Sequence, residues 1–396
     1  MKNFLICKYL CLLSGFFAVT AFFPFGVQNV HAQPVILSTM PLVNQRVVTR
    51  FNLGNFERIR QNQYALSCLY MQDCYPAESE YGEGEHVDET TFRGQMGACS
   101  PCQPACSSGL YTAMPCYGGG SLWFQNYGDF VTQQARYPGL HGYHADSYGL
   151  SFGYDILTGY HSVFGVAVGG AFSDAKAKNA DQKNETDSFL VALYGNTNVH
   201  TWNVVGSIGY VHSAFETHRS SYTEPGERLY SNHHGETMFG SFEISSAVFQ
   251  QSLCMTPFLA YDFIRMKENG YDERWTTDDA PDDALKIGKR RSTSYLQTLG
   301  LRFERAYYEN GGWLVQPSFS IGWLHDYGQR RIFTNAVLDG QRYKIKGTAM
   351  NKNRLVVSLG VTASMGNRTS LFARYDGEYN RRYNAQTVQF GFGLGY

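Results

Sequence analysis

Large apolar residues alternate with small or polar ones along the last eleven positions of the chain, 386–396. The large side chains are those of Val388, Phe390, Phe392, Leu394 and Tyr396. Successive side chains of a strand point to opposite faces, so this pattern predicts a strand with one apolar face and one polar or small-residue face. A soluble sandwich could also use such a strand.

The same alternation recurs upstream and begins at about residue 121. It predicts twelve strands, over 122–133, 146–158, 162–176, 186–198, 201–217, 236–250, 253–267, 293–307, 312–326, 353–365, 369–381 and 386–396. The expected connections alternate between tight turns and long polar loops, the longest being 218–235, 268–292 and 327–352. We expect His233 and His234 to be solvated in the first of these loops. Short turns on one side and long loops on the other are typical of an outer-membrane barrel with both termini in the periplasm.

The strand expected over 369–381 carries three charges of one parity, Arg374, Asp376 and Glu378. Charges are costly against lipid but inexpensive in a polar lumen, where Arg374 can pair with its acidic neighbours. We therefore predict that these three side chains face the lumen.

The chain opens with the features of a secretory signal peptide, predicted over 1–32. Lys2 and Lys8 precede an apolar stretch over 10–25, and a small-residue cleavage site follows at 30–32. No later stretch is apolar enough for a spanning helix, so a membrane protein of this sequence must span as strands.

Residues 33–120 show no sustained alternation, but a mild helical pattern runs over about 43–70. This region contains six cysteines, Cys68, Cys74, Cys99, Cys102, Cys106 and Cys116. Export brings them into an oxidising compartment, so disulfides are the first interpretation. Zinc binding by the last four is the alternative, and the spacing does not fix a connectivity.

Composition agrees with a barrel: aromatic residues are 15% of the chain, charged residues only 17%, and there are 41 glycines. The formal net charge of -1 gives no electrostatic footprint for nucleic acid. Gly149-Leu-Ser151-Phe-Gly153 matches the nucleophile motif of hydrolases, but it lies inside a predicted strand and not at a strand-to-helix turn. We predict no enzyme activity and no cofactor.

Residues 121–396 resemble the autotransporter β-domain family, the translocator half of type V secretion. The resemblance begins at Leu122-Trp-Phe-Gln-Asn-Tyr-Gly-Asp-Phe and continues at Ala145-Asp-Ser-Tyr-Gly-Leu-Ser-Phe-Gly-Tyr-Asp. It ends at Leu371-Phe-Ala-Arg-Tyr-Asp-Gly-Glu-Tyr and the aromatic-terminated last strand. The resemblance implies a barrel that holds or delivers an N-terminal passenger, with the connecting segment threading the pore. Pro115 and three glycines stand directly before the first strand, where a helix able to fill the lumen would be expected.

The last residues also resemble the signal read by the barrel-assembly machinery, with Gln389, Gly391, Leu394 and Tyr396 at the polar, glycine and two hydrophobic positions. A strand that ends the chain can pair through its backbone with an open edge of an assembly factor. The implied partners are this machinery, the general secretion translocon and outer-membrane lipid.

Together these patterns predict an all-β fold, a transmembrane antiparallel up-and-down barrel of about twelve strands with a short irregular or helical N-terminal segment. The expected organisation is a signal peptide at 1–32, a cysteine-rich segment at 33–120 and the barrel at 121–396. The expected function is a monomeric outer-membrane barrel that delivers or anchors its own N-terminal segment at the cell surface. The alternative is a porin-like channel or adhesin plugged by that segment.

Overall fold

The computed structural model describes residues 45, 46 and 48–51 and most of the chain from Gly120 to Gly395. The gaps in the second part lie at 136–141, 158–161, 179, 200–201, 222, 225, 251–252, 276–282, 310–312, 329–332, 339, 347–351 and 366–368. The predicted signal peptide and the six N-terminal cysteines lie outside the described residues.

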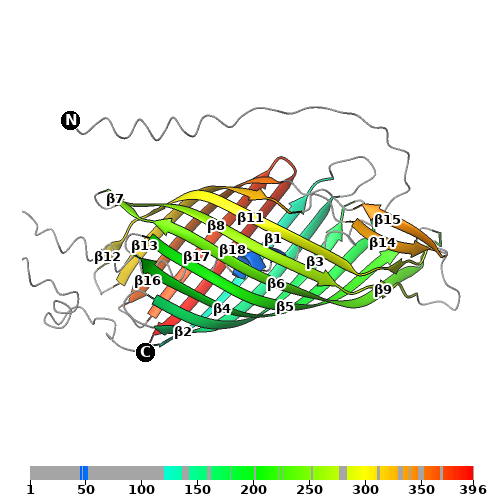
Figure 1. Cartoon of the computed structure of the whole chain (residues 1–396), viewed down its shortest axis with the longest axis horizontal. Coiled ribbons are helices and arrows are strands. Elements are labelled where there is room, and N and C mark those ends of the chain that lie inside the picture. Colours follow the sequence, from blue (N-terminus) through cyan, green and yellow to red (C-terminus); the bar gives the residue numbers. More distant parts are fainter. Residues whose placement is uncertain are drawn as a thin grey trace, which may run out of the picture. The chain divides into compact units, whose positions relative to one another are not determined.

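Twelve strands form the barrel wall (Figure 1). They are β1 (Gly120–Gln133), β2 (Tyr143–Leu157), β3 (Ser162–Ala177), β4 (Gln182–Val199), β5 (Trp202–Ser220), β6 (Arg228–Ser246), β8 (Leu253–Glu268), β11 (Arg290–Glu304), β13 (Trp313–Asp326), β16 (Asn353–Met365), β17 (Thr369–Asn380) and β18 (Tyr383–Gly395). Each strand pairs antiparallel with its chain neighbour in the wall. The predicted fold class and strand number are confirmed.

The first and last strands close the barrel. β1 pairs with β18 from Ser121 opposite Gly395 to Gln133 opposite Tyr383, and β11 pairs with both β8 and β13. Because the start of β1 and the end of β18 lie together, we call this the terminal end of the barrel and the opposite one the loop end.

The connections at the loop end contain structure of their own. Four short strands form a separate sheet there, in the order β15 (Gln341–Lys346), β14 (Phe333–Leu338), β10 (Lys286–Ile287) and β9 (Tyr271–Asp272). At the terminal end, β7 (Val248–Gln250) pairs with β8 and β12 (Tyr307–Glu309) pairs with β13.

The predicted loop at 218–235 is wrong, because β5 continues to Ser220 and β6 already begins at Arg228. The same correction moves His233 and His234 into β6, where His233 is buried and His234 exposed. Their outward neighbours in this region are polar, as at Glu216 and Asn232. A strand that rises beyond lipid keeps its inward apolar residues but loses the outward ones, so the alternation of hydrophobicity disappears while the strand continues.

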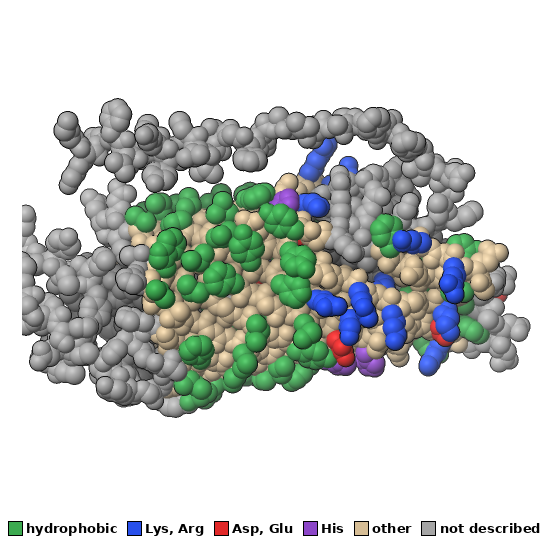
Figure 2. Space-filling view, in the orientation of Figure 1, with side chains coloured by type: hydrophobic (Ala, Val, Ile, Leu, Met, Phe, Trp, Pro, Cys, Tyr) green, Lys and Arg blue, Asp and Glu red, His purple; other side chains and the backbone are tan. Residues whose placement is uncertain are grey.

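The outer surface of the wall carries an apolar band around the barrel. Exposed large hydrophobic side chains recur on nearly every wall strand, for example Phe152, Leu193, Ile208, Trp323 and Leu359. Figure 2 shows them as a green field that ends where basic and acidic side chains begin, toward the loop end. An exposed apolar band of this kind is the surface that contacts hydrocarbon in a transmembrane barrel.

The inner surface is polar or closely packed. Ser151 lies buried and inward-facing in β2, and the two glycines of its motif make room for aromatic rings of β1. A Cβ added at Gly149 would lie 2.3 Å from the ring of Tyr127, and one at Gly153 would lie 2.2 Å from that of Trp123. The motif thus lies on a strand and not on a nucleophile elbow, and packing explains its glycines.

We expect the cost of an arginine on the outer surface to depend on its depth in the membrane. Leu359→Arg on β16 places a charge in the apolar band, where it should lower the free energy of unfolding by about 2–4 kcal/mol. Asn232→Arg on β6 places the same charge beyond the band and should change stability by less than about 0.5 kcal/mol. Urea titration in lipid vesicles measures both. Equal losses would show that Leu359 does not face lipid.

Part of the helical pattern predicted over 43–70 is observed, since residues 45, 46 and 48–51 are helical. Figure 1 shows this helix, in blue, inside the barrel. In the described part of the chain no helix combines the length and the hydrophobicity needed to cross a membrane.

Candidate functional site

The helix at 45–51 presents two different faces to the barrel wall. Val48 and Phe51 are buried among apolar side chains, and the Phe51 ring lies 6.2 Å from that of Phe239 on β6 in an edge-to-face arrangement. Arg46 and Arg50, four positions apart and hence on one helix face, meet the wall at the junction of β1, β17 and β18. The helix therefore packs on one face and makes ion pairs on the other.

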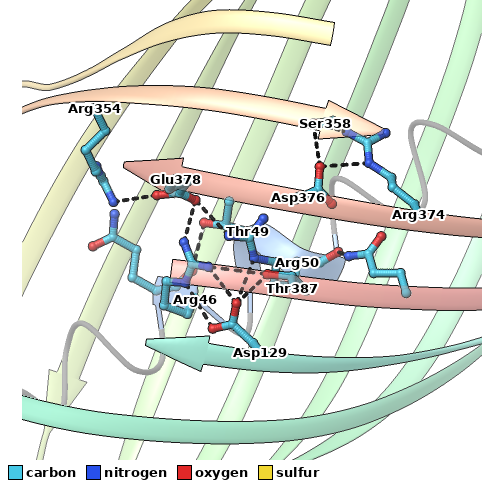
Figure 3. Close-up of polar contacts among 12 residues, drawn as sticks. Arg46, Thr49, Arg50, Asp129, Arg354, Ser358, Arg374, Asp376, Glu378 and Thr387 are labelled. Atoms are coloured by element: carbon cyan, nitrogen blue, oxygen red, sulfur yellow. Dashed lines mark hydrogen bonds and ion pairs between the residues drawn. The ribbon is translucent and has the colours of Figure 1, made fainter. Parts of the chain in front are cut away.

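Two carboxylates bind both arginines (Figure 3). The Asp129 carboxylate of β1 accepts hydrogen bonds from Arg46 Nη2 at 2.6 Å and from Arg46 Nε at 3.1 Å. It also accepts one from Arg50 Nε at 3.2 Å. The Glu378 carboxylate of β17 accepts Arg50 Nη2 at 2.9 Å and forms an ion pair with Arg46. On the side away from the helix, Arg354 Nη1 donates to Glu378 at 2.9 Å. We call Arg46, Arg50, Asp129 and Glu378 the lumen clamp.

The clamp is almost fully shielded from solvent, with relative accessibilities of 5% or less for its four residues. Burial by itself lowers the pKa of Arg46, but the charges of Asp129 and Glu378 outweigh it and hold the pKa well above its ordinary value. Breaking a buried pair by removing one partner costs about 3–5 kcal/mol, because the other charge stays buried without compensation. The bidentate contact of Arg46 with Asp129 also fixes the orientation of the helix.

The helix has a defined direction within the barrel. Arg46 Nη2 donates to Thr387 Oγ1 at 3.4 Å, whereas the backbone carbonyl of Arg50 accepts from Gln389 Nε2 at 3.2 Å, two positions further along β18. β18 runs from the loop end to the terminal end. Helical side chains lean toward the helix N-terminus, so Arg50 can reach back to the carboxylates that Arg46 meets. The helix thus runs from the loop end toward the terminal end.

The three charges predicted to face the lumen are all buried on the inward side of β17. Glu378 belongs to the clamp. Arg374 Nε donates to Asp376 Oδ1 at 2.8 Å, and Ser358 Oγ of β16 donates to the same oxygen at 2.6 Å.

The sequence did not reveal the other three members of the clamp. Asp129 stands in a strand where Trp123 and Tyr127 also face inward, so apolar parity alone does not separate its two faces. The signal that could have found Arg46 and Arg50 is their spacing of four between apolar positions, which gives a helix one charged and one apolar face.

The residues of the predicted assembly signal take different positions on β18. Gln389 and Gly391 face the lumen, where Gln389 binds Arg50, and a Cβ at Gly391 would lie 2.0 Å from the Phe372 ring. Leu394 is exposed on the outer surface. Tyr396 lies outside the described residues. Gln389 and Gly391 thus have packing roles in the folded barrel besides any role in its assembly.

Cysteine and metal chemistry leave few candidates in the described chain. Cys254 is buried in β8. Among the described residues, no group of His, Cys, Asp and Glu side chains is arranged to hold a metal ion.

Comparison with known proteins agrees with this architecture. A family model, the autotransporter β-domain, matches residues 122–376, which is more than half of the chain. The translocator domain of the autotransporter NalP from Neisseria meningitidis is similar over 70% of this chain and 88% of its own, with 16% identity and a TM-score of 0.56. The β-domain of the Bordetella autotransporter BrkA is similar over 70% and 99%, with 18% identity and a TM-score of 0.52.

At these identities the two solved structures establish the fold alone, and a search of curated proteins finds no match. The family itself rests on the matched model, which spans the wall from β1 to β17. This family of translocator barrels is not enzymatic and is located in the outer membrane. The chain belongs to the autotransporter β-domain family.

Proposed function

We propose that this barrel anchors its own N-terminal segment in the outer membrane by holding the helix at 45–51 in its lumen. The observation that carries the proposal is the lumen clamp, in which two arginines of the segment meet two buried carboxylates of the wall. A segment that was merely passing through would gain little from pairs whose geometry fixes one position. The proposal includes an export signal at 1–32, passage through the general secretion translocon and insertion by the barrel-assembly machinery.

The direction of the helix decides which part of the segment is displayed. In outer-membrane barrels the termini and short turns face the periplasm, so the loop end faces the cell exterior. The helix starts nearer the loop end, and residues 33–44 are then the part that emerges at the surface. Phe51 lies on the side of the helix nearer the terminal end, and β1 begins at that end with Gly120. We therefore place the cysteine-rich stretch between these two residues in the periplasm. In this arrangement only residues 33–44 would be displayed, and not the whole segment 33–120.

Selective labelling of single thiols tests this direction. In a chain whose six N-terminal cysteines are serines, Ser38→Cys should react in intact cells with a maleimide too large to cross the outer membrane. A matched chain that keeps only Cys99 should react only after the outer membrane is permeabilised. Cys254 is common to both chains and buried in the wall, so it serves as the background.

Labelling of Cys99 in intact cells at the level of Ser38→Cys would contradict the proposed direction and favour display of the whole segment. The same assay on the unmodified chain reports the cysteine chemistry. The periplasm is oxidising, so we expect the six thiols to react only after reductant has been added. Six thiols that are free without reductant, or a metal released by chelator, would favour the zinc alternative.

The clamp also supports a second candidate function, a channel plugged by its N-terminal segment. Both functions place the helix in the lumen, and they differ in whether removal of the helix gives a selective conductance. The selectivity of such a channel for its solute would then be determined by the polar inner wall, where Arg374, Asp376 and Arg354 remain. The conductance of a barrel without the side chains of Arg46 and Arg50 separates the two.

A further inference from the structure

Three basic side chains gather on the outer surface just beyond the apolar band. Arg265 and Lys267 lie on β8, Arg291 lies on the neighbouring β11, and all three are exposed. Figure 2 shows basic side chains beside the green apolar field on this face. Lys267 stands directly opposite Arg291 in the register of the two strands, and Arg265 lies diagonally opposite Arg291.

Two aromatic side chains at the edge of the apolar band show how high above the membrane these cations lie. Phe263 and Tyr295 face each other across β8 and β11 with ring centroids 5.3 Å apart, and both are exposed. Aromatic girdles of this kind lie at the membrane–water interface. Arg265 is two positions beyond Phe263, and Lys267 and Arg291 are four positions beyond Phe263 and Tyr295. At about 3.3 Å per residue on a tilted strand, they stand roughly 5–10 Å above the border, where lipid headgroups lie.

The three charges are not balanced by the residues that the structure describes. Like charges directly opposite each other on neighbouring strands are destabilising unless an anion lies between them. In the part of the chain that the structure describes, none of the three makes an ion pair, although Glu236 of β6 stands opposite Lys267. Glu236 is instead engaged by the Tyr210 hydroxyl. Among these described neighbours, three positive charges and the one negative charge of Glu236 leave two positive charges unbalanced.

A comparable position elsewhere on the wall, separated from β8 by β5 and β6, is built differently. Lys176 of β3 and Lys183 of β4 also lie beyond the apolar band. Both form ion pairs with Asp174, at 3.4 and 3.3 Å. These lysines already have their counter-ion, so they need none from the membrane.

We propose that Arg265, Lys267 and Arg291 bind the phosphate groups of a lipid headgroup in the outer leaflet. Guanidinium and ammonium donors match phosphate oxygens, and Arg291 offers a planar pair of donors. The acyl chains of such a lipid would lie along Phe263 and Tyr295. Because this surface faces the membrane at the loop end, the lipid is one of the outer leaflet and not of the periplasmic one.

Lipid exchange into nanodiscs that hold the full-length barrel tests the proposal. The discs contain a neutral lipid with either bisphosphorylated lipid A or its dephosphorylated form, and native mass spectrometry counts the lipid retained. A basic residue near an anionic surface contributes about a factor of five in binding, so the three together should give wild type a preference of about a hundredfold for the phosphorylated form. The Lys267→Gln, Arg291→Gln double variant should lose about 25-fold of that preference, the product of two such factors.

The matched control is Lys176→Gln with Lys183→Gln, which removes the same number of outward charges and should keep the wild-type preference. Raising the salt concentration should weaken the preference in wild type, because these charges are exposed. Heat-modifiable migration checks that each variant is folded. Equal retention of the two lipids by wild type, or an equal loss in both double variants, would overturn the proposal.

Discussion

Replacing Arg46 and Arg50 together by glutamine should release the helix from the lumen and raise the ion conductance of the barrel in planar bilayers. Each arginine meets both Asp129 and Glu378 in a buried site, and loss of a partner from such a site costs about 3–5 kcal/mol. The contacts that remain, mainly those of Val48 and Phe51, belong to a helix too short to be stable by itself. The carboxylates can then be hydrated only if the helix leaves.

The control for this experiment is Arg265→Gln with Arg291→Gln, which removes two arginines from the outer surface and should leave the conductance unchanged. Arg46→Lys with Arg50→Lys keeps the charge but loses the bidentate geometry, so it should give brief openings. A selective conductance in the glutamine variant favours the plugged channel, whereas an unselective one favours the anchor. A glutamine variant as closed as wild type would show that the clamp does not hold the helix.

Removing Leu394, Gly395 and Tyr396 should abolish insertion into the outer membrane. In the folded barrel Leu394 and Gly395 contribute the last pairs of the β1–β18 seam, including Ser121 opposite Gly395, and Leu394 also stands opposite Thr369 at the start of β17. Their loss should therefore change the stability of a finished barrel little. Their proposed recognition by the assembly machinery predicts a much larger effect in cells, with the chain degraded in the periplasm. Fractionation and heat-modifiable migration measure this outcome.

Refolding distinguishes assembly from stability. The shortened chain, diluted from urea into lipid vesicles without assembly machinery, should form a heat-modifiable barrel with a yield close to that of the full chain. Leu394→Ala, which keeps the length of β18, should show an intermediate defect in cells. Normal amounts of shortened barrel in the outer membrane would refute a role for these residues in recognition.

The sequence predicted the barrel well because each wall strand repeats one physical requirement. Leu355, Val357 and Leu359 must face lipid while Ser358 must not, and this alternation is visible without any knowledge of partners. The prediction failed where the requirement changes. Beyond the membrane, the outward positions of β5 and β6 became polar, and a paired strand was interpreted as a loop.

The clamp could not be predicted for a different reason. Arg46 and Glu378 are 332 positions apart, and nothing local to either residue indicates the other. The helix that carries Arg46 owes its stability to tertiary contacts and not to propensity, so its ends are weakly marked in the sequence. The aromatic rings of β1 can point inward because Gly149 and Gly153 of the next strand leave room for them. The alternation of apolar and polar residues does not reveal this, because it assigns glycine to neither face.

The binding site for the helix takes its parts from both sides of the barrel seam: Asp129 belongs to the first strand, Thr387 and Gln389 to the last, and Glu378 to the one before it. The binding site for the helix thus does not exist until the last strand has met the first. In a chain that folds in this way, docking of the N-terminal helix depends on closure of the barrel, since the helix can dock only on a wall whose last strand has already paired with its first. Once docked, the helix ties the two edges together, so opening of the seam and undocking of the helix become a single event.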